Sequence, residues 1–244
     1  MGIPIGDERL AVREAPLVNL TLIALNSTLF IVGVLAPWLL VPGARSYYDV
    51  LLSLGVIPAY VVKGERVYTL ITSMFLHGSL VHLLGNMLYL YIFGDNIEFV
   101  LGRARYILFY IASGVLAALT HIAIAVMWSP DSLYIPAVGA SGAISGVLGA
   151  YLLLFPHGRV RFIALWGWIP VILNLPATIY IGFWFLYQLF MGIVTVGAQV
   201  SVGVAFWAHI GGFIAGLLLA PILVNRRRLA IARIEYYGYH EYYV

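Results

Sequence analysis

Cysteine is absent from the 244 residues, and charged residues make up only 9% of them. Without cysteine, the chain has no disulfide, no thiol nucleophile and no cysteine-based metal site. Soluble globular domains carry about 25% charged residues, so the scarcity of charge argues against that class. The chain is instead 63% hydrophobic, with a mean hydropathy of +0.99. This composition indicates a polytopic membrane protein.

Long apolar runs predict an all-α membrane fold with six transmembrane helices. The candidate spans are Leu17–Leu40, Leu80–Val100, Tyr106–Trp128, Ser141–Phe155, Pro176–Val196 and Val202–Val224. The fourth is roughly 22 Å long at the helical rise, too short to cross a bilayer alone, so one end should face protein or water inside the membrane. We therefore divide the chain into an N-terminal cytoplasmic segment (1–16), a membrane domain (17–224) and a basic, Tyr-rich cytoplasmic tail (225–244).

The distribution of Lys and Arg predicts the orientation, because these residues gather on the cytoplasmic side of membrane proteins. With the N-terminus placed inside, ten of the thirteen fall in cytoplasmic segments and three fall outside. The cytoplasmic set is Arg9, Arg13, Arg103, Arg105, Arg159, Arg161, Arg226, Arg227, Arg228 and Arg233, and the external set is Arg45, Lys63 and Arg66. Both termini are therefore expected in the cytoplasm. Because these basic residues flank apolar segments, we expect lipid contacts and no nucleic-acid partner.

Four polar side chains are predicted to lie at a similar depth, in the outer half of the bilayer. His82 and Asn86 lie near the start of the second span, Ser141 opens the fourth, and His209 lies early in the sixth. Polar groups in a membrane are costly unless they face a bundle interior or a water-filled cavity. A structural hydrogen bond could explain one or two of them, but a hydroxyl and an imidazole at a shared depth favour a catalytic cluster.

Stripes of glycine follow both the serine and the histidine. They are Gly142, Gly146 and Gly149 in the fourth span, and Gly212 and Gly216 in the sixth. Small residues four apart allow two helix backbones to approach closely. We expect this approach to bring the hydroxyl within reach of the imidazole.

A serine beside a histidine can carry out nucleophilic catalysis, because the imidazole removes the hydroxyl proton. The external acids Asp49, Glu65 and Asp131 all lie in predicted loops, so a Ser141–His209 dyad is expected, with no acidic third member. The developing oxyanion needs donors. We assign this role to the backbone N–H of Ser141 and to the side chains of His82 and Asn86. The alternative is that these two side chains form structural hydrogen bonds between helices.

Other intramembrane chemistries find less support. The H-E-x-x-H motif of zinc proteases is absent, and Asp95 and Glu98 have no acidic partner in another span, as an aspartyl mechanism would require. Those two acids are expected to anchor a helix end at the interface. His77 and His121 are expected to be structural. No metal and no cofactor are predicted.

The sequence resembles the rhomboid family of intramembrane serine proteases, of the prokaryotic six-helix type. The resemblance rests on Gly139-Ala140-Ser141-Gly142, on Ala208-His209-Ile210-Gly211-Gly212 with Gly216, and on His77, His82 and Asn86 after Thr72-Ser73-Met74-Phe75-Leu76. It continues through Ile92-Phe93-Gly94-Asp95-Asn96-Ile97-Glu98 and covers roughly residues 67–221. It implies Ser141 as nucleophile at the top of a short central helix, His209 as general base, and His82 and Asn86 as oxyanion donors.

Two positions depart from the family pattern. Tyr68-Thr69 stands where many relatives carry Trp-Arg in the first external loop. Ser145 stands where some relatives place an aromatic residue that packs on the base, so Trp207 or Phe206 is a candidate to orient His209.

The resulting hypothesis is a serine endopeptidase of the cell membrane. It would cleave transmembrane or membrane-proximal segments of other membrane proteins near the outer leaflet, through an acyl-enzyme. A non-catalytic rhomboid-like protein that binds membrane clients and, third, a small transporter are the alternatives. The sequence indicates neither the identity of the substrate nor the oligomeric state.

Overall fold

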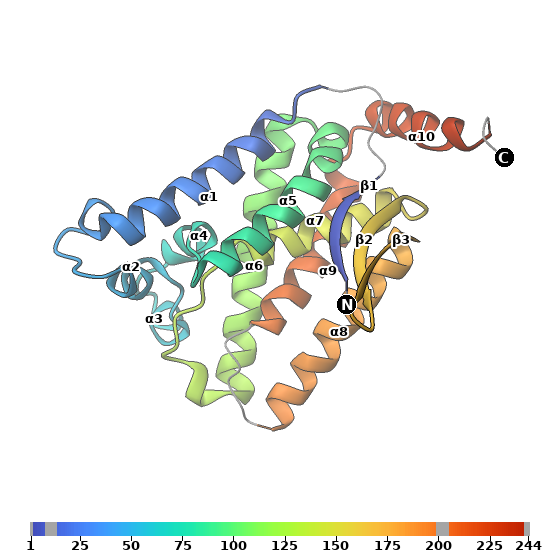
Figure 1. The fold of residues 1–244 in the computed structure, drawn as a ribbon. Coiled ribbons are helices and arrows are strands. Elements are labelled where there is room, and N and C mark those ends of the chain that lie inside the picture. Colours follow the sequence, from blue (N-terminus) through green and yellow to red (C-terminus); the bar gives the residue numbers. More distant parts are fainter. Residues whose placement is uncertain (1, 8–13, 199–204, 242–244) are drawn as a thin grey trace.

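The structure, a computed structural model, describes residues 2–7, 14–198 and 205–241, which are mostly helical (Figure 1). The α-helices are α1 (Leu17–Leu35), α2 (Tyr47–Leu54), α3 (Pro58–Val62), α4 (Thr69–Thr72), α5 (Leu80–Leu101), α6 (Arg103–Trp128), α7 (Ser141–Leu154), α8 (Ala177–Gly197), α9 (Phe206–Leu223) and α10 (Arg226–Glu241). Short 3-10 helices are η1 (Pro37–Leu39), η2 (Ser73–Phe75) and η3 (Pro130–Ser132), and the strands are β1 (Ile3–Asp7), β2 (Arg159–Trp166) and β3 (Ile169–Pro176).

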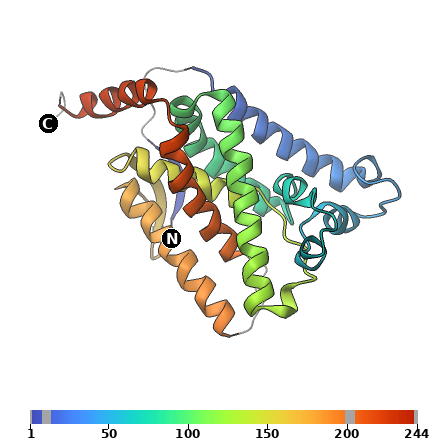
Figure 2. The same ribbon diagram turned by 180° about the vertical axis from the view of Figure 1, so that it is seen from behind.

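Helix α7 lies at the centre of the bundle. It has only 14 residues, and every residue from Gly142 to Tyr151 is buried. α9 and α6 pack along it, as the reverse view shows, while α1 lies outside α5 (Figure 2). The prediction of a short fourth helix enclosed by protein is therefore confirmed.

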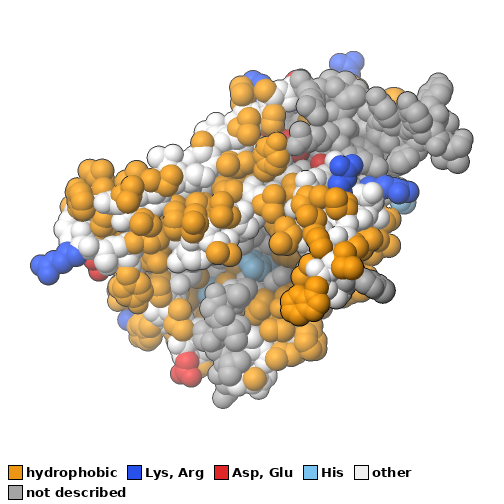
Figure 3. Space-filling view, in the orientation of Figure 1, with side chains coloured by type: hydrophobic (Ala, Val, Ile, Leu, Met, Phe, Trp, Pro, Cys, Tyr) orange, Lys and Arg blue, Asp and Glu red, His pale blue; other side chains and the backbone are white. Residues whose placement is uncertain are grey.

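Helices form at all six predicted ranges, with ends that differ by a few residues. Four described helices, α1, α6, α8 and α9, are long and apolar enough to cross a membrane alone, and α5 qualifies together with the segment bent by 93° before it. The apolar surface forms a wide belt, with Lys and Arg towards its edges (Figure 3). The count of six spans stays a prediction, and the predicted start of the sixth at Val202 lies outside the described residues.

A small three-stranded sheet was not predicted. β2 and β3 form an antiparallel hairpin, and β1 pairs with β2, with Ile3 opposite Ile163. The hairpin turns at Gly167, whose φ of 64° suits the tight turns that join twisted strands. Residues 159–169 are thus mostly β-structure, and the N-terminal segment, predicted to be cytoplasmic, contributes a strand.

Glu98 joins two helices, although the sequence suggested an interface anchor. Its side chain is almost fully buried and accepts hydrogen bonds from the backbone N–H groups of Val18 and Asn19. These are first-turn donors of α1 that have no partner within their own helix. The Asn19 side chain also accepts from Tyr106 Oη, so α1, α5 and α6 meet in one network.

The loop between α1 and α5, predicted to be external, is fastened through Arg66, in place of the Trp-Arg pair expected from the family pattern. The Arg66 guanidinium donates to the carbonyls of Leu52 and Ser53 at 2.8 and 2.6 Å. Thr72 Oγ1 donates to Leu54 O at 2.7 Å. These bonds hold α2 against the segment that leads into α5.

Helix α10 occupies most of the predicted tail. The Arg228 guanidinium, near its start, pairs with Glu14 and donates to Phe99 O. The side chains of Tyr236, Tyr237 and Tyr239 and the whole of Tyr242 and Tyr243 lie outside the described structure, so the role of this Tyr-rich part stays open.

Glycine allows α7 and α9 to pack backbone to backbone, as the sequence predicted. A Cβ on Gly216 would overlap the carbonyl oxygen of Gly146, and one on Gly212 would overlap that of Gly142. A Cβ on Gly149 would overlap the carbonyl of Phe213. Each of these obstacles is backbone, which cannot turn aside as a flexible side chain could.

We therefore expect Gly216→Ala to destabilise the bundle by about 1–3 kcal/mol, the usual cost of overpacking. The measurement is the unfolding temperature of the purified protein in detergent. Gly182→Ala on α8 is the matched control, because a Cβ there meets nothing within 4 Å. That variant should unfold at or slightly above the wild-type temperature, since alanine favours helix. Equal stability of the two variants would contradict the close-packing account.

Candidate active site

Ser141 is the first residue of α7, at the end of a loop that glycine brings close to α5. Gly139 has a φ of 131°, and a Cβ there would lie 2.9 Å from the imidazole of His82. The backbone N–H of Gly139 donates to Ser73 O at 2.9 Å. Only glycine combines this conformation with so close an approach. The loop thereby sets the start of α7, and with it Ser141, beside His82.

His209 lies in the first turn of α9, directly across from Ser141. Its Nε2 is 2.9 Å from Ser141 Oγ, within hydrogen-bond distance. The predicted encounter of hydroxyl and imidazole is therefore present in the structure. It follows from the glycine contacts, because His209 lies three residues before Gly212 and Ser141 directly precedes Gly142.

His82 and Asn86 lie on one face of α5, turned towards the same place. Ser79 caps α5 by accepting from His82 N at 3.1 Å, which fixes the first turn. The backbone N–H of Gly78 donates to His82 Nδ1 at 3.4 Å, which leaves the ring proton on Nε2, the nitrogen nearer Gly139. Asn86 is buried, and its Nδ2 has no hydrogen-bond partner within the described part of the chain. Both side chains thus present N–H groups available to a ligand.

One cavity of about 250 Å³ lies between α5, α7, α8 and α9, and it is lined by Ser141, His209, His82 and Asn86. Its remaining lining residues are Val81, Gly85, Tyr89, Ile144, Ser145, Leu148 and Trp184. In the space-filling view a histidine surface is visible in a hollow between apolar elements (Figure 3). A mostly apolar cavity with a few convergent polar groups is typical of a binding site for a hydrophobic segment.

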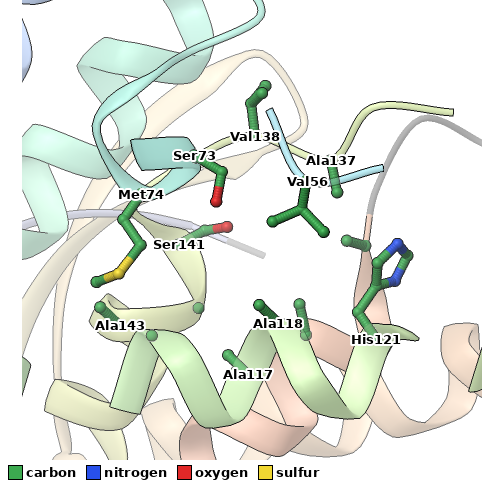
Figure 4. A pocket seen from close by; sticks show the side chains of 15 residues that line it. Val56, Ser73, Met74, Ala117, Ala118, His121, Ala137, Val138, Ser141 and Ala143 are labelled. Atoms are coloured by element: carbon green, nitrogen blue, oxygen red, sulfur yellow. The ribbon is translucent and has the colours of Figure 1, made fainter. Parts of the chain in front are cut away.

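A second, smaller cavity lies on another side of Ser141 (Figure 4). It measures about 40 Å³ and is lined by residues that include Ser73, Met74 and His121. One water molecule has a share of about 30 Å³ in the liquid, so this space is too small for a peptide segment. The larger cavity is therefore the candidate for substrate binding.

His77 supports the site from behind. Its ring is fully buried and packs edge-on against His82, with ring centroids 5.1 Å apart. The Tyr47 hydroxyl donates to His77 O at 2.9 Å. The His77 backbone N–H in turn donates to Tyr47 Oη at 3.2 Å. Burial raises the pKa of Tyr47 despite the opposing effect of this second hydrogen bond, so the hydroxyl stays protonated and able to donate. These contacts agree with the structural role expected for His77.

The two residues suggested for orienting His209 have partners elsewhere in the structure. Trp207 Nε1 donates to Gly192 O on α8 at 3.1 Å, and Phe206 packs against Tyr187. The Trp184 ring lies beside the His209 ring, with centroids 6.0 Å apart and planes 34° apart. Gln188 Oε1 lies 2.8 Å from His209 Nδ1. Sequence reasoning missed both α8 residues; the available signal was a single amide side chain within an otherwise apolar span.

Comparison with known proteins agrees with this arrangement. The family model described as Rhomboid domain matches residues 64–226, about two thirds of the chain. The chain belongs to the rhomboid family. The resemblance seen in the motifs is thereby confirmed, and rhomboid membership together with the apolar helices makes the chain a multi-pass membrane protein.

The rhomboid relatives include plant and bacterial proteins. RHOMBOID-like protein 4 of Arabidopsis thaliana is 34% identical over 166 residues, which is 68% of this chain and 36% of that protein. Rhomboid protease GluP of Bacillus subtilis is 31% identical over 67% of this chain and 27% of its own length. Putative rhomboid protease YdcA, also of Bacillus subtilis, is 38% identical over 38% of this chain and 44% of its own length. The matched region thus spans less than half of each of these relatives.

Proposed function

We propose that the chain is an intramembrane serine endopeptidase that cleaves transmembrane or membrane-proximal segments of other membrane proteins. The observation that carries the proposal is the 2.9 Å contact between Ser141 Oγ and His209 Nε2 within the 250 Å³ cavity. A hydroxyl paired with an imidazole is the minimal arrangement for nucleophilic acyl transfer.

In the proposed reaction, Ser141 Oγ attacks the carbonyl carbon of the scissile peptide bond while His209 Nε2 takes the hydroxyl proton. His209 then passes that proton to the departing amine as the C–N bond breaks, leaving an ester on Ser141. Water attacks the ester, and His209 removes its proton and returns it to Ser141 Oγ. The products are a carboxylic acid and an amine, and the dyad is restored.

The oxyanion formed in each attack needs hydrogen-bond donors close to Ser141. The backbone N–H of Ser141 is available at the start of α7, where the helix dipole also favours negative charge. Asn86 Nδ2 has no hydrogen-bond partner among the residues that the structure describes, and the proton on His82 Nε2 faces the same loop. Donors that are held in place before the reaction stabilise the transition state without having to reorganise.

The substrate is proposed to enter from the side and to unwind locally. A helical segment keeps its peptide groups bonded to one another, so an intact helix does not offer a carbonyl to Ser141. The cavity is bounded by Tyr89 on α5 and Trp184 on α8, and Ile144 and Leu148 of α7 supply apolar walls. Such walls suit the hydrophobic residues of a transmembrane segment.

The proposed location is the cell membrane, with both termini in the cytoplasm and the site near the outer leaflet. The support is the ten-to-three distribution of Lys and Arg described above. Asp95 and Glu98 lie towards the opposite end of α5 from His82 and Asn86.

The direct test is cleavage of a model single-span substrate in detergent or liposomes. We expect Ser141→Ala and His209→Ala each to abolish cleavage, because each removes one half of the dyad. Ser113→Ala is the control, since Ser113 is a buried serine on α6 whose hydroxyl has no partner in the described structure. It should cleave like wild type. Full activity of Ser141→Ala would refute the proposal. If wild type and Ser141→Ala both bound the substrate and neither cleaved it, a client-binding protein would be favoured.

The oxyanion assignment predicts a second pattern. Asn86→Ala and His82→Ala should each lower kcat by about 10²–10³-fold, the usual effect of losing one oxyanion donor. Asn86→Asp should be at least as slow, because it replaces the amide donor with a carboxylate oxygen. Steady-state kinetics on folded protein provide the measurement. Wild-type kcat in Asn86→Ala would show that Asn86 serves only the structure.

A further inference from the structure

Gln188 contacts the nitrogen of His209 that Ser141 does not use. Its Oε1 lies 2.8 Å from Nδ1, while Nε2 of the same ring lies 2.9 Å from Ser141 Oγ. Gln188 is only 6% exposed, although Phe183, Leu186 and Phe190 on the same helix are each more than half exposed. The amide therefore turns inward to the imidazole, away from the lipid-facing side of α8.

We propose that Gln188 is a positioning residue, which holds His209 in the tautomer and orientation that can accept the proton of Ser141. The inference rests on the serine-protease function proposed above and deepens it. It replaces the expected dyad with a Ser141–His209–Gln188 chain that spans α7, α9 and α8.

The amide carbonyl determines where the ring proton lies. A carbonyl oxygen can only accept a hydrogen bond, so the proton of the neutral imidazole must lie on Nδ1. Nε2 then keeps its lone pair, and the Ser141 hydroxyl donates to it. With the opposite tautomer, Nε2–H would point at Ser141 Oγ and could not receive its proton.

A neutral acceptor suits a site within the membrane. A carboxylate in this position would place a charge in an apolar bundle, which is costly unless it is fully compensated. No Asp or Glu lies in the outer half of any predicted span. An amide supplies the same acceptor oxygen without the charge.

Trp184 completes the support for the imidazole. It lies four residues before Gln188, so both side chains project from one face of α8. The Trp184 ring lies beside that of His209, with centroids 6.0 Å apart and planes 34° apart, whereas Gln188 bonds to the edge of the imidazole. In the proposed arrangement the hydrogen bond limits rotation of the imidazole, and the neighbouring Trp184 ring restricts the space in which it could tilt. At the family's aromatic position, Ser145 instead donates to Ser141 O.

The test compares Gln188→Met with Gln188→Glu. Methionine has a similar length and no strong acceptor, whereas the glutamate side chain keeps an acceptor oxygen whether it is ionised or protonated. We expect Gln188→Met to lower both kcat and the rate of Ser141 labelling by a fluorophosphonate about 10²-fold, as for a misplaced catalytic group. KM and the unfolding temperature should stay close to wild type. Gln188→Glu should recover most of the rate, and Leu186→Met, on the exposed side of α8, should match wild type.

Two kinetic outcomes would overturn the assignment. One is a wild-type rate in Gln188→Met. The other is a Gln188→Glu variant that keeps the wild-type unfolding temperature and is nevertheless as slow as Gln188→Met. The cost of a buried carboxylate would then not explain the loss, and the acceptor oxygen would not be the property that matters.

A spectroscopic readout separates this inference from the proposed function. In ¹⁵N-histidine-labelled protein, the His209 signals are those lost in His209→Ala. They should report Nδ1–H in wild type and a mixture of tautomers in Gln188→Met. A wild-type signal from Nε2–H would overturn the role of Gln188. If Ser141→Ala were as active as wild type, the proposed serine-protease mechanism would fail, and the tautomer would still decide the role of Gln188.

Discussion

The backbone contact between α7 and α9 is the constraint on which the candidate site depends. Packed helices usually lie 8–10 Å apart, and short side chains such as serine and histidine meet only where their helices approach closely. Glycines on both helices let the carbonyls of Gly142 and Gly146 face Gly212 and Gly216 directly. On another face of α7, small residues of α6 continue this packing, as where Ala117 fills the space beside Gly142. The 2.9 Å contact between hydroxyl and imidazole is a consequence of this packing.

Burial in an apolar bundle also determines which polar groups the site contains. Its partners are neutral: a hydroxyl, imidazoles, the Asn86 amide and the Gln188 amide. Charge appears instead near the other end of the bundle, where Glu98 receives two backbone N–H groups of α1 and lies 3.9 Å from Arg103. A buried carboxylate is tolerated there because donors surround it. The fold thus separates the candidate site, whose cavity is lined by no Asp, Glu, Lys or Arg among the described residues, from a charged structural network.

The sequence predicted those features that depend on local pattern. Hydropathy located the helices, and polar residues within apolar runs pointed to Ser141, His209, His82 and Asn86, which the structure brings to one cavity. Their catalytic roles stay a prediction. The pairing of β1 with β2 joins residues about 160 positions apart, and no local pattern specifies such a partner. Gln188 was missed for a related reason, since the side of α8 that faces His209 depends on the rotation of that helix in the bundle. Arg66 anchors the loop, and its backbone has an unusual φ of 54°. The spacing of residues in the sequence does not indicate that Arg66 has this conformation or this role.

The position of α8 links access to the site with its chemistry. Trp184 forms part of the cavity wall and also lies beside the His209 ring, and the Tyr180 hydroxyl meets that of Tyr89 on α5 at 3.0 Å. A movement of α8 away from both α5 and α9 would separate this tyrosine pair and withdraw Gln188 from His209 Nδ1. The imidazole would then lose the contact that we propose fixes its tautomer. The proposed mechanism therefore requires α8 to lie against α9 at Gln188 during cleavage, so that any widening for substrate entry is reversed or confined to other parts of the helix.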